Sequence, residues 1–363
     1  AAVFDTAILG SNPSAPAKLM KKFSLNKIFN NGILKVFFPF YRSKEIKTLF
    51  SILEKESYKN IPTAMFVGGC VRKHISNEDI DDIDIACILT PEEIKKKFQG
   101  SEFKIIDTGV EHGSITLILK NFKFEITTLR KDIKTDGRHA DVSFIDDWLE
   151  DSKRRDFTIN SIYMDKKGNF YDPQFGKKDL QKKIVRFIGD PASRIEEDYL
   201  RIIRFLRFSI QYECKETDHK TIEAIKLNLD GIKNLSKERM MNELYKIFKL
   251  NNVDVLLENE DLKEIFLIIF PELKYFKRLE KLLLFTKRKN ISQEVESIFA
   301  SLLVDDSDNF EYFCHKYKAS NKLKDNLFYI SKHYTEFKND KNFLKNNFKK
   351  KIYYMGKKNI KKL

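Results

Sequence analysis

The sequence predicts an α+β protein in which a small mixed sheet with helices precedes a long helical part. Between residues 64 and 128, short apolar runs alternate with turn signals, which is typical of strands. After about residue 180, leucine, isoleucine and phenylalanine recur at helical spacing with few turn signals. At 363 residues the chain is longer than one core usually holds, so we expect two or more packed units.

The sheet is expected to follow a helix at residues 44–57, where apolar residues recur every three or four positions. Pro91 opens a second helix that ends near Gly100, and Asn121 separates two strands as a hairpin turn. The sheet should end near residue 130. The expected strands are 64–67, 82–89, 103–106, 114–119 and 122–128.

The two ends of the chain differ from the rest in composition. Residues 1–19 are rich in Ala, Ser and Pro, so we interpret them as a non-native or disordered leader, with Met20 as a plausible natural start. Residues 319–363 hold 13 lysines and three acids, which supply most of the net charge of +14. Lysines mixed with aromatic residues suit an RNA backbone and its bases, although an ordinary amphipathic helical end is the alternative.

The cysteines and the hydropathy of the chain indicate the cellular compartment in which we expect the protein. Four widely spaced cysteines form no metal-binding pattern and are expected to be small core residues in a reducing compartment: Cys70, Cys87, Cys214 and Cys314. No apolar run approaches the roughly 18–20 residues of a membrane-spanning helix, so we expect no membrane partner and a cytoplasmic protein.

The most informative stretch lies between residues 67 and 86. Gly68 and Gly69 end an apolar run, Arg72 follows, and Asp82 and Asp84 then alternate with isoleucines. Residues i and i+2 of a strand share a face, so the two aspartates point the same way. Mg²⁺ prefers carboxylate and phosphate oxygens, and glycines let backbone N–H groups approach phosphate, so the pattern favours a Mg²⁺–polyphosphate site. A tight turn and a solvated strand face are the alternatives.

Glu125 offers a third carboxylate. It shares a strand face with Lys123 and Thr127. If this strand neighbours the aspartate strand, Glu125 lies beside the acid pair. The alternative is a partner for Lys123 or for a hydroxyl group.

A second cluster contains Arg154, Arg155, Asp156 and Asn160. Arginine suits triphosphate through its forked donors, and Asp156 can accept a hydrogen bond from a ribose hydroxyl. A surface ion-pair cluster at a helix start is the alternative.

A third cluster repeats every three residues along one expected helix face: Asp198, Arg201, Arg204 and Arg207. Three arginines against one pair of adjacent acids leave positive charge unbalanced, which favours binding of an anion. The alternative is a salt-bridge ladder worth roughly a few tenths of a kcal/mol per pair.

These clusters and two further motifs resemble the class II tRNA nucleotidyltransferase (CCA-adding enzyme) and bacterial poly(A) polymerase family. The resemblance covers roughly residues 60–250, and residues 1–45 and 290–363 carry none of it. The five motifs are Gly-Gly-Cys-Val-Arg with Asp-Ile-Asp-Ile-Ala, Arg-Arg-Asp-Phe-Thr-Ile-Asn, Glu-Asp-Tyr-Leu-Arg-Ile-Ile-Arg-Phe-Leu-Arg-Phe, Asp172-Pro173-x-x-Gly176-x-x-Asp179-Leu180, and Glu238-Arg239-Met240-x-x-Glu243-Leu244.

The resemblance implies a role for each matching residue. Asp82 and Asp84 would hold Mg²⁺. Glu125 is the candidate third catalytic carboxylate because of its strand face, not because of a family motif. Asp198 and Arg201 would read the base, because cytosine and adenine both present an amine beside a ring nitrogen acceptor, whereas guanine and uracil present a carbonyl there. The remaining nucleotide-binding residues would be Gly68, Gly69, Arg72, Arg155, Asp156, Asn160, Arg204 and Arg207.

The resemblance also implies an architecture of head, neck, body and tail. We expect a catalytic nucleotidyltransferase head at 44–150, an all-helical neck with the templating helix at 151–250, a helical body at 251–318 and a basic helical tail at 319–363. Arg130 to Ser143 resembles the flexible loop that enzymes adding the final A retain, and this loop would contain Asp136, Gly137 and Arg138.

The implied function is addition of CCA to tRNA from CTP and ATP, with pyrophosphate released. Tyr199 favours this branch, since a proline is more typical of poly(A) polymerases two residues before the first arginine. Poly(A) polymerase, A-adding enzyme and inactive RNA-binding homologue remain the alternatives. One departure is Lys73, where the family usually has Asp, and we expect it to affect folding or nucleotide affinity before catalysis.

Overall fold

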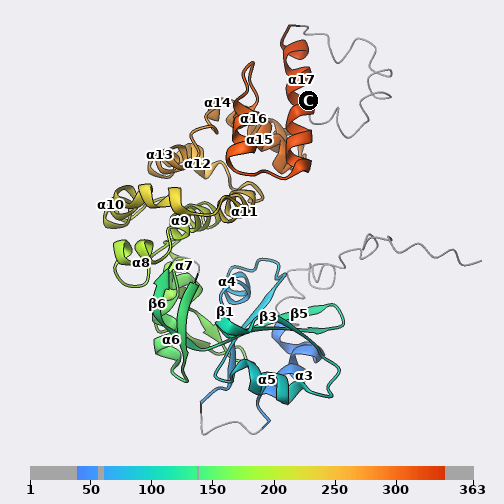
Figure 1. Ribbon diagram of the computed structural model, residues 1–363, viewed down its shortest axis with the longest axis vertical. Helices are drawn as coiled ribbons and strands as arrows, with labels where there is room; N and C mark the ends of the chain where they lie inside the picture. The colour runs from blue at the N-terminus through green and yellow to red at the C-terminus, as the bar shows by residue number, and fades with distance from the viewer. Residues whose placement is uncertain (1–38, 56–60, 137–138, 340–363) are drawn as a thin grey trace, which may run out of the picture. The chain divides into compact units, whose positions relative to one another are not determined.

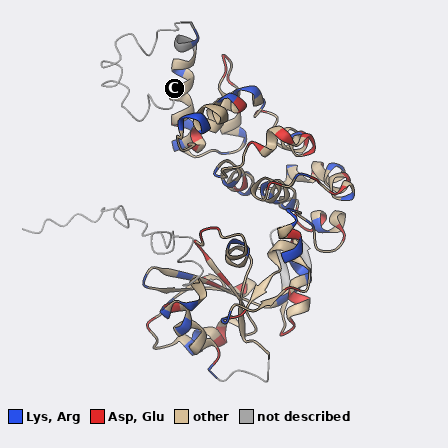
Figure 2. Ribbon diagram, turned by 180° about the vertical axis from the view of Figure 1, so that it is seen from behind, with Lys and Arg blue, Asp and Glu red and all other residues tan. Residues whose placement is uncertain are grey.

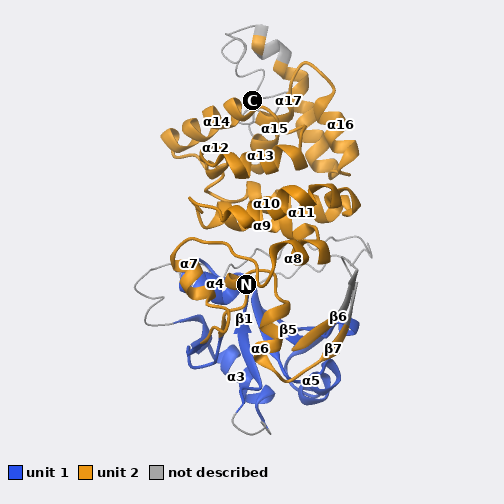
Figure 3. Cartoon of the chain, turned by 90° about the vertical axis from the view of Figure 1, so that its left-hand side faces the viewer, with its two compact units in different colours: residues 1–128, 164–170 blue, residues 129–163, 171–363 orange. Residues whose placement is uncertain are grey.

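The computed structural model describes residues 39–55, 61–136 and 139–339, and the chain divides into two compact units (Figures 1 and 3). Unit 1 holds the described residues up to 128 together with 164–170, and unit 2 holds 129–163 and the described residues from 171 onward. The expected leader at 1–19 and residues 340–363 of the expected tail lie outside the described residues. A mixed sheet followed by helices confirms the predicted α+β class.

Five strands of the main sheet lie close to their predicted positions. They are β1 (Ala64–Val67), β2 (Ile83–Cys87), β3 (Lys104–Gly109), β4 (Ser114–Leu119) and β5 (Phe122–Thr128). The short strands β8 (Tyr163–Met164) and β9 (Phe170–Tyr171) complete the order β3-β4-β5-β2-β1-β8-β9. The β2–β5 pair is parallel, whereas the β1–β2, β3–β4 and β4–β5 pairs are antiparallel, so the sheet is mixed.

Three α-helices of unit 1 are α3 (Lys44–Leu53), α4 (Gly69–Ile75) and α5 (Pro91–Phe98). Short 3-10 turns, η1 (Phe40–Arg42) and η2 (Val110–His112), accompany them. The hydroxyl of Ser43 accepts a hydrogen bond from the Ile46 N–H at the start of α3, and Thr90 and Glu93 form a capping box before α5. The apolar face of α3 is buried, as its spacing predicted.

The sheet continues beyond the predicted limit near residue 130. The strands β8 and β9 lie in the segment expected to be an all-helical neck, so that expectation is wrong in this part. Each of these strands has two residues, which is too short to show an alternating pattern.

The segment expected to be a flexible loop is a second, two-stranded sheet. It pairs β6 (Arg130–Asp136) with β7 (His139–Phe144) in antiparallel register from Arg130↔Phe144 to Asp136↔His139. These strands were not predicted, because β6 carries a single apolar residue, Ile133, and so shows no alternating pattern. Gly137 and Arg138 lie outside the described residues.

Unit 2 is otherwise helical, which confirms the prediction for the chain after about residue 180. Acidic and basic residues are interspersed along its helices (Figure 2). Besides the 3-10 turns η3 (Thr158–Asn160) and η4 (Leu229–Asn234), it contains α6 (Trp148–Arg154), α7 (Gly176–Gln181), α8 (Pro191–Glu197), α9 (Leu200–Gln211), α10 (His219–Asn228), α11 (Lys237–Phe248), α12 (Val255–Glu258), α13 (Glu260–Ile269), α14 (Phe276–Lys289), α15 (Val295–Leu303), α16 (Asn309–Lys316) and α17 (Asn321–Asn339). None of the described helices is long and apolar enough to cross a membrane.

An aromatic cluster fixes the segment after α6 within unit 2. Phe157 is fully buried, and its ring centroid lies 4.7 Å from that of Phe187 and 5.5 Å from that of Phe208. Phe187 also stacks on Phe205 of α9, at 6.0 Å. Aromatic side chains bury large areas, so this cluster anchors the chain on both sides of Phe157.

The motif from Asp172 to Leu180 is accounted for by backbone geometry. The carboxylate of Asp172 accepts hydrogen bonds from the Gly176 and Lys177 N–H groups, both at 2.8 Å, and so holds the start of α7. A Cβ on Gly176 would lie 2.0 Å from the Thr158 carbonyl oxygen. Only glycine allows this approach of two backbones.

We therefore expect Gly176→Ala to lower the free energy of unfolding by about 3 kcal/mol, because the backbones must separate. Urea denaturation measures the loss. Gly189→Ala is the control, since its φ is +84° but nothing lies within 4 Å of a Cβ there, and about 1 kcal/mol is expected. Equal losses in the two variants would contradict the role of the close approach.

Candidate functional site

The turn between β1 and α4 places a carboxylate over two glycines. Gly68 has φ +69° and ψ −124°, a conformation that side chains rarely allow. A Cβ on Gly68 or Gly69 would lie 3.7 or 3.6 Å from Oδ2 of Asp84. The Asp84 carboxylate thus lies directly beside the glycine turn, as the sequence suggested.

The third carboxylate lies on the neighbouring strand. In the parallel β2–β5 pair, Asp84 is the register partner of Glu125, so the adjacency on which its proposed role depended is present. Glu125 also forms an ion pair with Lys123 of its own strand, as the alternative interpretation expected. That hydrogen bond raises the pKa of Lys123, and the charges of Asp82 and Asp84 act in the same direction. The Lys123 ammonium group therefore interacts electrostatically with all three carboxylates.

The aspartates differ in exposure. Asp82 is exposed and lies immediately before β2, whereas Asp84 is half-buried within it. No group of three or more His, Cys, Asp or Glu within the described ranges is close enough to hold a metal ion by itself. Mg²⁺ usually takes one or two protein carboxylates and completes its shell with water and substrate phosphate, so this oxygen-donor set fits it.

Helix α4 carries three residues with different environments. The Cys70 thiol donates to the carbonyl oxygens of Val67 and Asp84, and burial raises its pKa to about 12, so it is a neutral structural group. Arg72 is only 6% exposed. Lys73, at the position of the family's Asp, forms a 2.6 Å ion pair with Asp81, the neighbour of Asp82. All four cysteines are buried, as expected.

In unit 2, the two arginines of the second cluster converge on a carboxylate that the sequence argument missed. Asp151 is fully buried. One of its oxygens accepts from Arg154 Nε at 2.8 Å, and the other accepts from Arg155 Nη2 at 2.9 Å. The Tyr163 hydroxyl donates to the same carboxylate at 2.7 Å, and its ring packs edge-on against Trp148. The spacing i to i+3 and i+4 on α6 was the available signal for Asp151.

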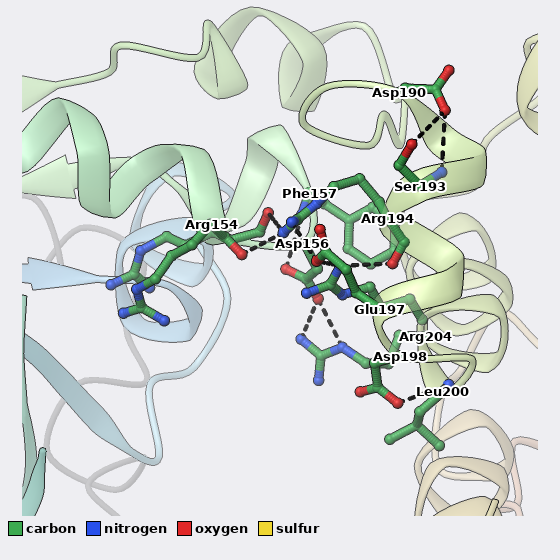
Figure 4. Close-up of polar contacts among 12 residues, drawn as sticks. Arg154, Asp156, Phe157, Asp190, Ser193, Arg194, Glu197, Asp198, Leu200 and Arg204 are labelled. Carbon is green, nitrogen blue, oxygen red and sulfur yellow. Dashed lines mark hydrogen bonds and ion pairs between the residues drawn. The ribbon is translucent and has the colours of Figure 1, made fainter. Parts of the chain in front are cut away.

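Asp156 is completely engaged by neighbouring donors (Figure 4). Its Oδ2 accepts from Nε and Nη2 of Arg204 at 2.7 and 2.6 Å. Its Oδ1 accepts from Asn160 Nδ2 at 2.7 Å and from the Phe157 N–H at 2.9 Å. Burial alone would raise the pKa of Asp156, but the charge of Arg204 and these hydrogen bonds hold it well below its usual range.

Asp198 lies in the junction between α8 and α9, outside the helix on which it was expected. Its backbone is extended, and its Oδ1 accepts from the Leu200 N–H at 3.2 Å. Oδ2 accepts from Arg239 Nη2 of α11 at 2.7 Å. Arg239 belongs to the fifth motif, but nothing in the sequence indicated that it reaches Asp198, 41 residues away.

The expected surplus of positive charge on α9 is wrong, because each arginine has a carboxylate partner. Arg201 pairs with Glu197 at 2.6 Å, Arg204 with Asp156, and Arg207 with Glu243 of α11 at 2.6 Å. Glu197 is four residues before Arg201, but Asp156 and Glu243 lie 48 and 36 residues from their partners. The spacing of residues along one helix does not reveal carboxylate partners that come from other helices and loops.

The last predicted features are in the tail. Among the aromatic residues in the described part of the tail, Phe328 of α17 is 56% exposed, whereas the Tyr334 hydroxyl accepts from Arg278 Nη2 at 3.0 Å and is structural. Leu323, Leu327 and Ile330 bury the other face of α17. The described part of the tail is thus an amphipathic helix, and its RNA contacts stay a prediction.

Comparison with known proteins identifies the family. Residues 64–186 match the Poly A polymerase head domain, and residues 216–277 match the probable RNA and SrmB-binding site of polymerase A. The CCA-adding enzyme of Oceanobacillus iheyensis is 34% identical over 293 residues, or 79% of this chain and 69% of that protein. The chain belongs to the class II CCA-adding enzyme and poly(A) polymerase family.

Two further relatives define how far the similarity extends. The human mitochondrial CCA tRNA nucleotidyltransferase 1 is 42% identical over 215 residues, which cover 58% of this chain and 49% of that protein. The chain thus spans about half the length of its vertebrate relatives. The Bacillus stearothermophilus CCA-adding enzyme in complex with CTP has a similar structure, with a TM-score of 0.61 and 26% identity over 81% of this chain and 71% of that one.

The charges of Asp156 and Asp151 predict acid sensitivity. Arginines lower the pKa of each below the value of about 3.9 found in unfolded chains, although burial opposes this shift. Their contribution to stability is therefore present above about pH 4 and is lost as the pH falls towards their folded-state pKa values. We expect Asp156→Asn to cost about 2 kcal/mol at pH 7 and to reduce the loss of stability between about pH 5 and pH 3.

Urea unfolding at several pH values tests this prediction. The control is Asp325→Asn, which changes an exposed carboxylate on α17 and should follow the parent protein at every pH. A parallel offset of the Asp156→Asn curve at all pH values would show that the Asp156 carboxylate does not contribute to the pH dependence.

Proposed function

We propose that this protein is a template-independent RNA nucleotidyltransferase that adds CCA to the 3′ end of tRNA. The observation that carries the proposal is the Asp84 carboxylate beside the Gly68–Gly69 turn, with Glu125 in register on the adjacent strand. Family membership and the CTP complex of the B. stearothermophilus relative support the nucleotide substrates. Location in the cytoplasm stays a prediction, since the human relative is named mitochondrial.

The proposed reaction joins the RNA 3′ hydroxyl to the α-phosphate of CTP or ATP and releases pyrophosphate. Membership of a nucleotidyltransferase family favours a divalent metal, and we propose Mg²⁺ with Asp82 and Asp84 as its carboxylates. When bound there, the metal would stabilise negative charge on the phosphate oxygens. Glu125 adds negative charge beside the pair, and the Gly68–Gly69 backbone leaves room for the phosphates.

Base selection is assigned to Asp198 and Arg201. The Asp198 carboxylate is oriented by Arg239 and the Leu200 N–H, while Arg201 uses Nη1 for Glu197. Such fixed groups can accept a hydrogen bond from an exocyclic amine and donate one to a ring nitrogen, which both cytosine and adenine allow. Arg155, Asp156 and Asn160 are assigned to the triphosphate and ribose. In the described structure, however, Arg155 and Asp156 already have ion-pair partners within unit 2.

The alternatives keep the same fold. A poly(A) polymerase would use ATP alone on diverse RNA, an A-adding enzyme would act only on tRNA ending in CC, and an inactive homologue would bind RNA without reaction. The segment Arg130 to Ser143 favours enzymes that add the final A, since the resemblance assigns this segment to them. Lys73 replaces the family's usual Asp, but the residues assigned to the metal, the phosphates and the base are all present, which favours an active protein: Asp82, Asp84, Arg155, Asp156, Asp198 and Arg201.

Lys73 provides a test of the nucleotide site in unit 1. Lys73→Asp replaces an ion pair with repulsion beside Asp81, next to Asp82. We expect less than about 1 kcal/mol loss of stability, because the pair is exposed. The KM for CTP should rise about threefold, with kcat within about twofold, since a change of under 1 kcal/mol in binding has this size.

Lys95→Asp is the matched control for this variant. It replaces an exposed ion pair with Asp107 by repulsion in the same unit, outside the motif at residues 67–86. A Lys73→Asp variant that loses kcat while its KM is unchanged would show that this position affects the chemical step.

Incorporation of labelled CTP and ATP into tRNA transcripts tests the proposed function. The transcripts should end before CCA, after C and after CC. Two C residues followed by one A, with a requirement for Mg²⁺ and no long tail, would support CCA addition. Addition of A only to the CC-ended transcript would indicate an A-adding enzyme, and long A tails on any RNA would indicate a poly(A) polymerase.

Asp82→Ala and Asp84→Ala identify the metal carboxylates. Each should reduce incorporation about a hundredfold or more, because loss of metal-derived charge stabilisation is worth several kcal/mol, while tRNA binding persists. Asp107→Ala, which removes an exposed carboxylate of β3, should leave incorporation unchanged. Full incorporation by either of the first two variants would contradict the assignment, and no incorporation by the folded parent protein would favour the RNA-binding alternative.

A further inference from the structure

Arg194 of α8 is a buried arginine outside the assigned nucleotide-binding residues. It is 9% exposed. Its Nη2 donates to the backbone carbonyl oxygens of Arg154 and of Arg155, the latter at 2.8 Å, and its Nη1 donates to Glu197 (Figure 4). The guanidinium therefore holds main-chain atoms of the segment assigned to the triphosphate.

The same residue also contacts the base-reading side of unit 2 through its backbone. Arg201 Nη1 donates to the Arg194 carbonyl oxygen at 2.6 Å and to Glu197 Oε2 at 2.6 Å. Glu197 Oε2 thus accepts from both Arg194 and Arg201. Two guanidinium groups this close repel each other, so the shared carboxylate between them is needed to keep both in place.

We infer that Arg194 is a positioning residue that links the triphosphate-binding segment, Arg154 to Asp156, to the base-reading residue Arg201. The inference rests on the function proposed for these two groups. Arg194 itself touches no part of the nucleotide in this scheme. It acts by fixing the Arg154 and Arg155 backbone with its side chain and Arg201 with its carbonyl oxygen and Glu197.

The chemistry of the contacts explains why arginine stands here. The carbonyl oxygens of Arg154 and Arg155 lie at and just beyond the end of α6, where helical carbonyls lack partners in the helix. A planar guanidinium can donate to these oxygens and to a carboxylate at the same time through separate N–H groups. A lysine ammonium has no such rigid fork, so Arg194→Lys should restore the charge but not the geometry.

The contacts also leave Arg201 able to bind a base. Its Nη1 is engaged by Arg194 and Glu197, and within the described structure no hydrogen bond involves its Nε or Nη2. Loss of the Arg194 side chain removes one of the two arginine partners of Glu197 and, at the same time, the donor to the carbonyl oxygens at the end of α6. Arg201 and the segment Arg154 to Asp156 should then no longer be held in fixed positions relative to each other, although all their own side chains remain.

The test compares Arg194→Met with Arg194→Lys and with a control, Lys316→Met. The control removes the cation from another partly buried ion pair of unit 2, between Lys316 and Glu272 at 2.7 Å. Urea unfolding measures the structural cost in each variant. Equilibrium dialysis measures binding of CTP, ATP and UTP, and incorporation assays give kcat and KM for CTP and UTP on tRNA ending before CCA.

For Arg194→Met we expect CTP and ATP binding to weaken by about tenfold, as loss of charge-assisted positioning is worth about 1.4 kcal/mol. The preference for CTP over UTP in kcat/KM should also fall by about tenfold. Arg194→Lys should recover part of the stability but less of the preference. Lys316→Met should lose stability without a change in either nucleotide measurement.

Binding and base preference within about twofold of the parent in folded Arg194→Met would overturn the inference. The inference is also overturned if Lys316→Met, at a similar loss of stability, weakens nucleotide binding and base preference as much as Arg194→Met does. If Arg194→Met does not fold, Arg194→Lys and Glu197→Gln are measured in the same way, and unchanged base preference in both overturns it. Failure of the parent protein to incorporate any nucleotide contradicts the proposed function instead, and dialysis still tests whether Arg194 affects nucleotide binding.

Discussion

The ion pair between Asp156 and Arg204 is the contact on which the arrangement of unit 2 depends. It joins the segment that follows α6 to the middle of α9, 48 residues later in the chain, while the next residue, Phe157, is fully buried among aromatic rings. A charged contact and an apolar anchor thus act on adjacent residues. The polar contact fixes the direction of the segment, and the aromatic packing supplies the burial that holds it. The nucleotide-binding residues assigned in this unit lie on one of the two elements so joined, or at their ends.

In unit 2, carboxylate partners offset the energetic cost of burying several arginine side chains. Burial of one guanidinium is costly, but each arginine on α8, on α9 and at the end of α6 reaches a carboxylate, and Asp151 and Glu197 each pair with two of these arginines. Such sharing restricts the geometry, since a carboxylate satisfies two cations only when both approach in the correct directions. We infer that this network contributes more to a defined arrangement of side chains than to net stability. That is the property a base-reading surface made of side chains requires.

The sequence predicted the parts of the fold that depend on local pattern. Strands β1 to β5 and the buried face of α3 follow from residue spacing. The neighbouring positions of Asp84 and Glu125 depended on a strand pairing that the sequence left open and the structure supplies. Strands of two residues, and a strand pair with one apolar residue in β6, give no such pattern and were missed. The ion-pair partners were missed for a different reason. Glu243 and Arg239 come from α11, so only the packing of helices distant in sequence brings them to Arg207 and Asp198. The residue types of the candidate site were therefore predictable, but their electrostatic environment was not.

The position of Trp148 has a practical consequence. It is the single tryptophan of the chain, it begins α6, and its ring packs at 5.3 Å from that of Tyr163, whose hydroxyl binds the same carboxylate as Arg154 and Arg155. The tryptophan fluorescence of the protein, excited at wavelengths where its 14 tyrosines do not absorb, consequently comes from one known place beside the assigned phosphate-binding arginines. Quenching or spectral shift of that emission reports on rearrangement of α6 without any label. Trp148 is thus a built-in fluorescent probe next to Tyr163, which belongs to the hydrogen-bond network around Asp151.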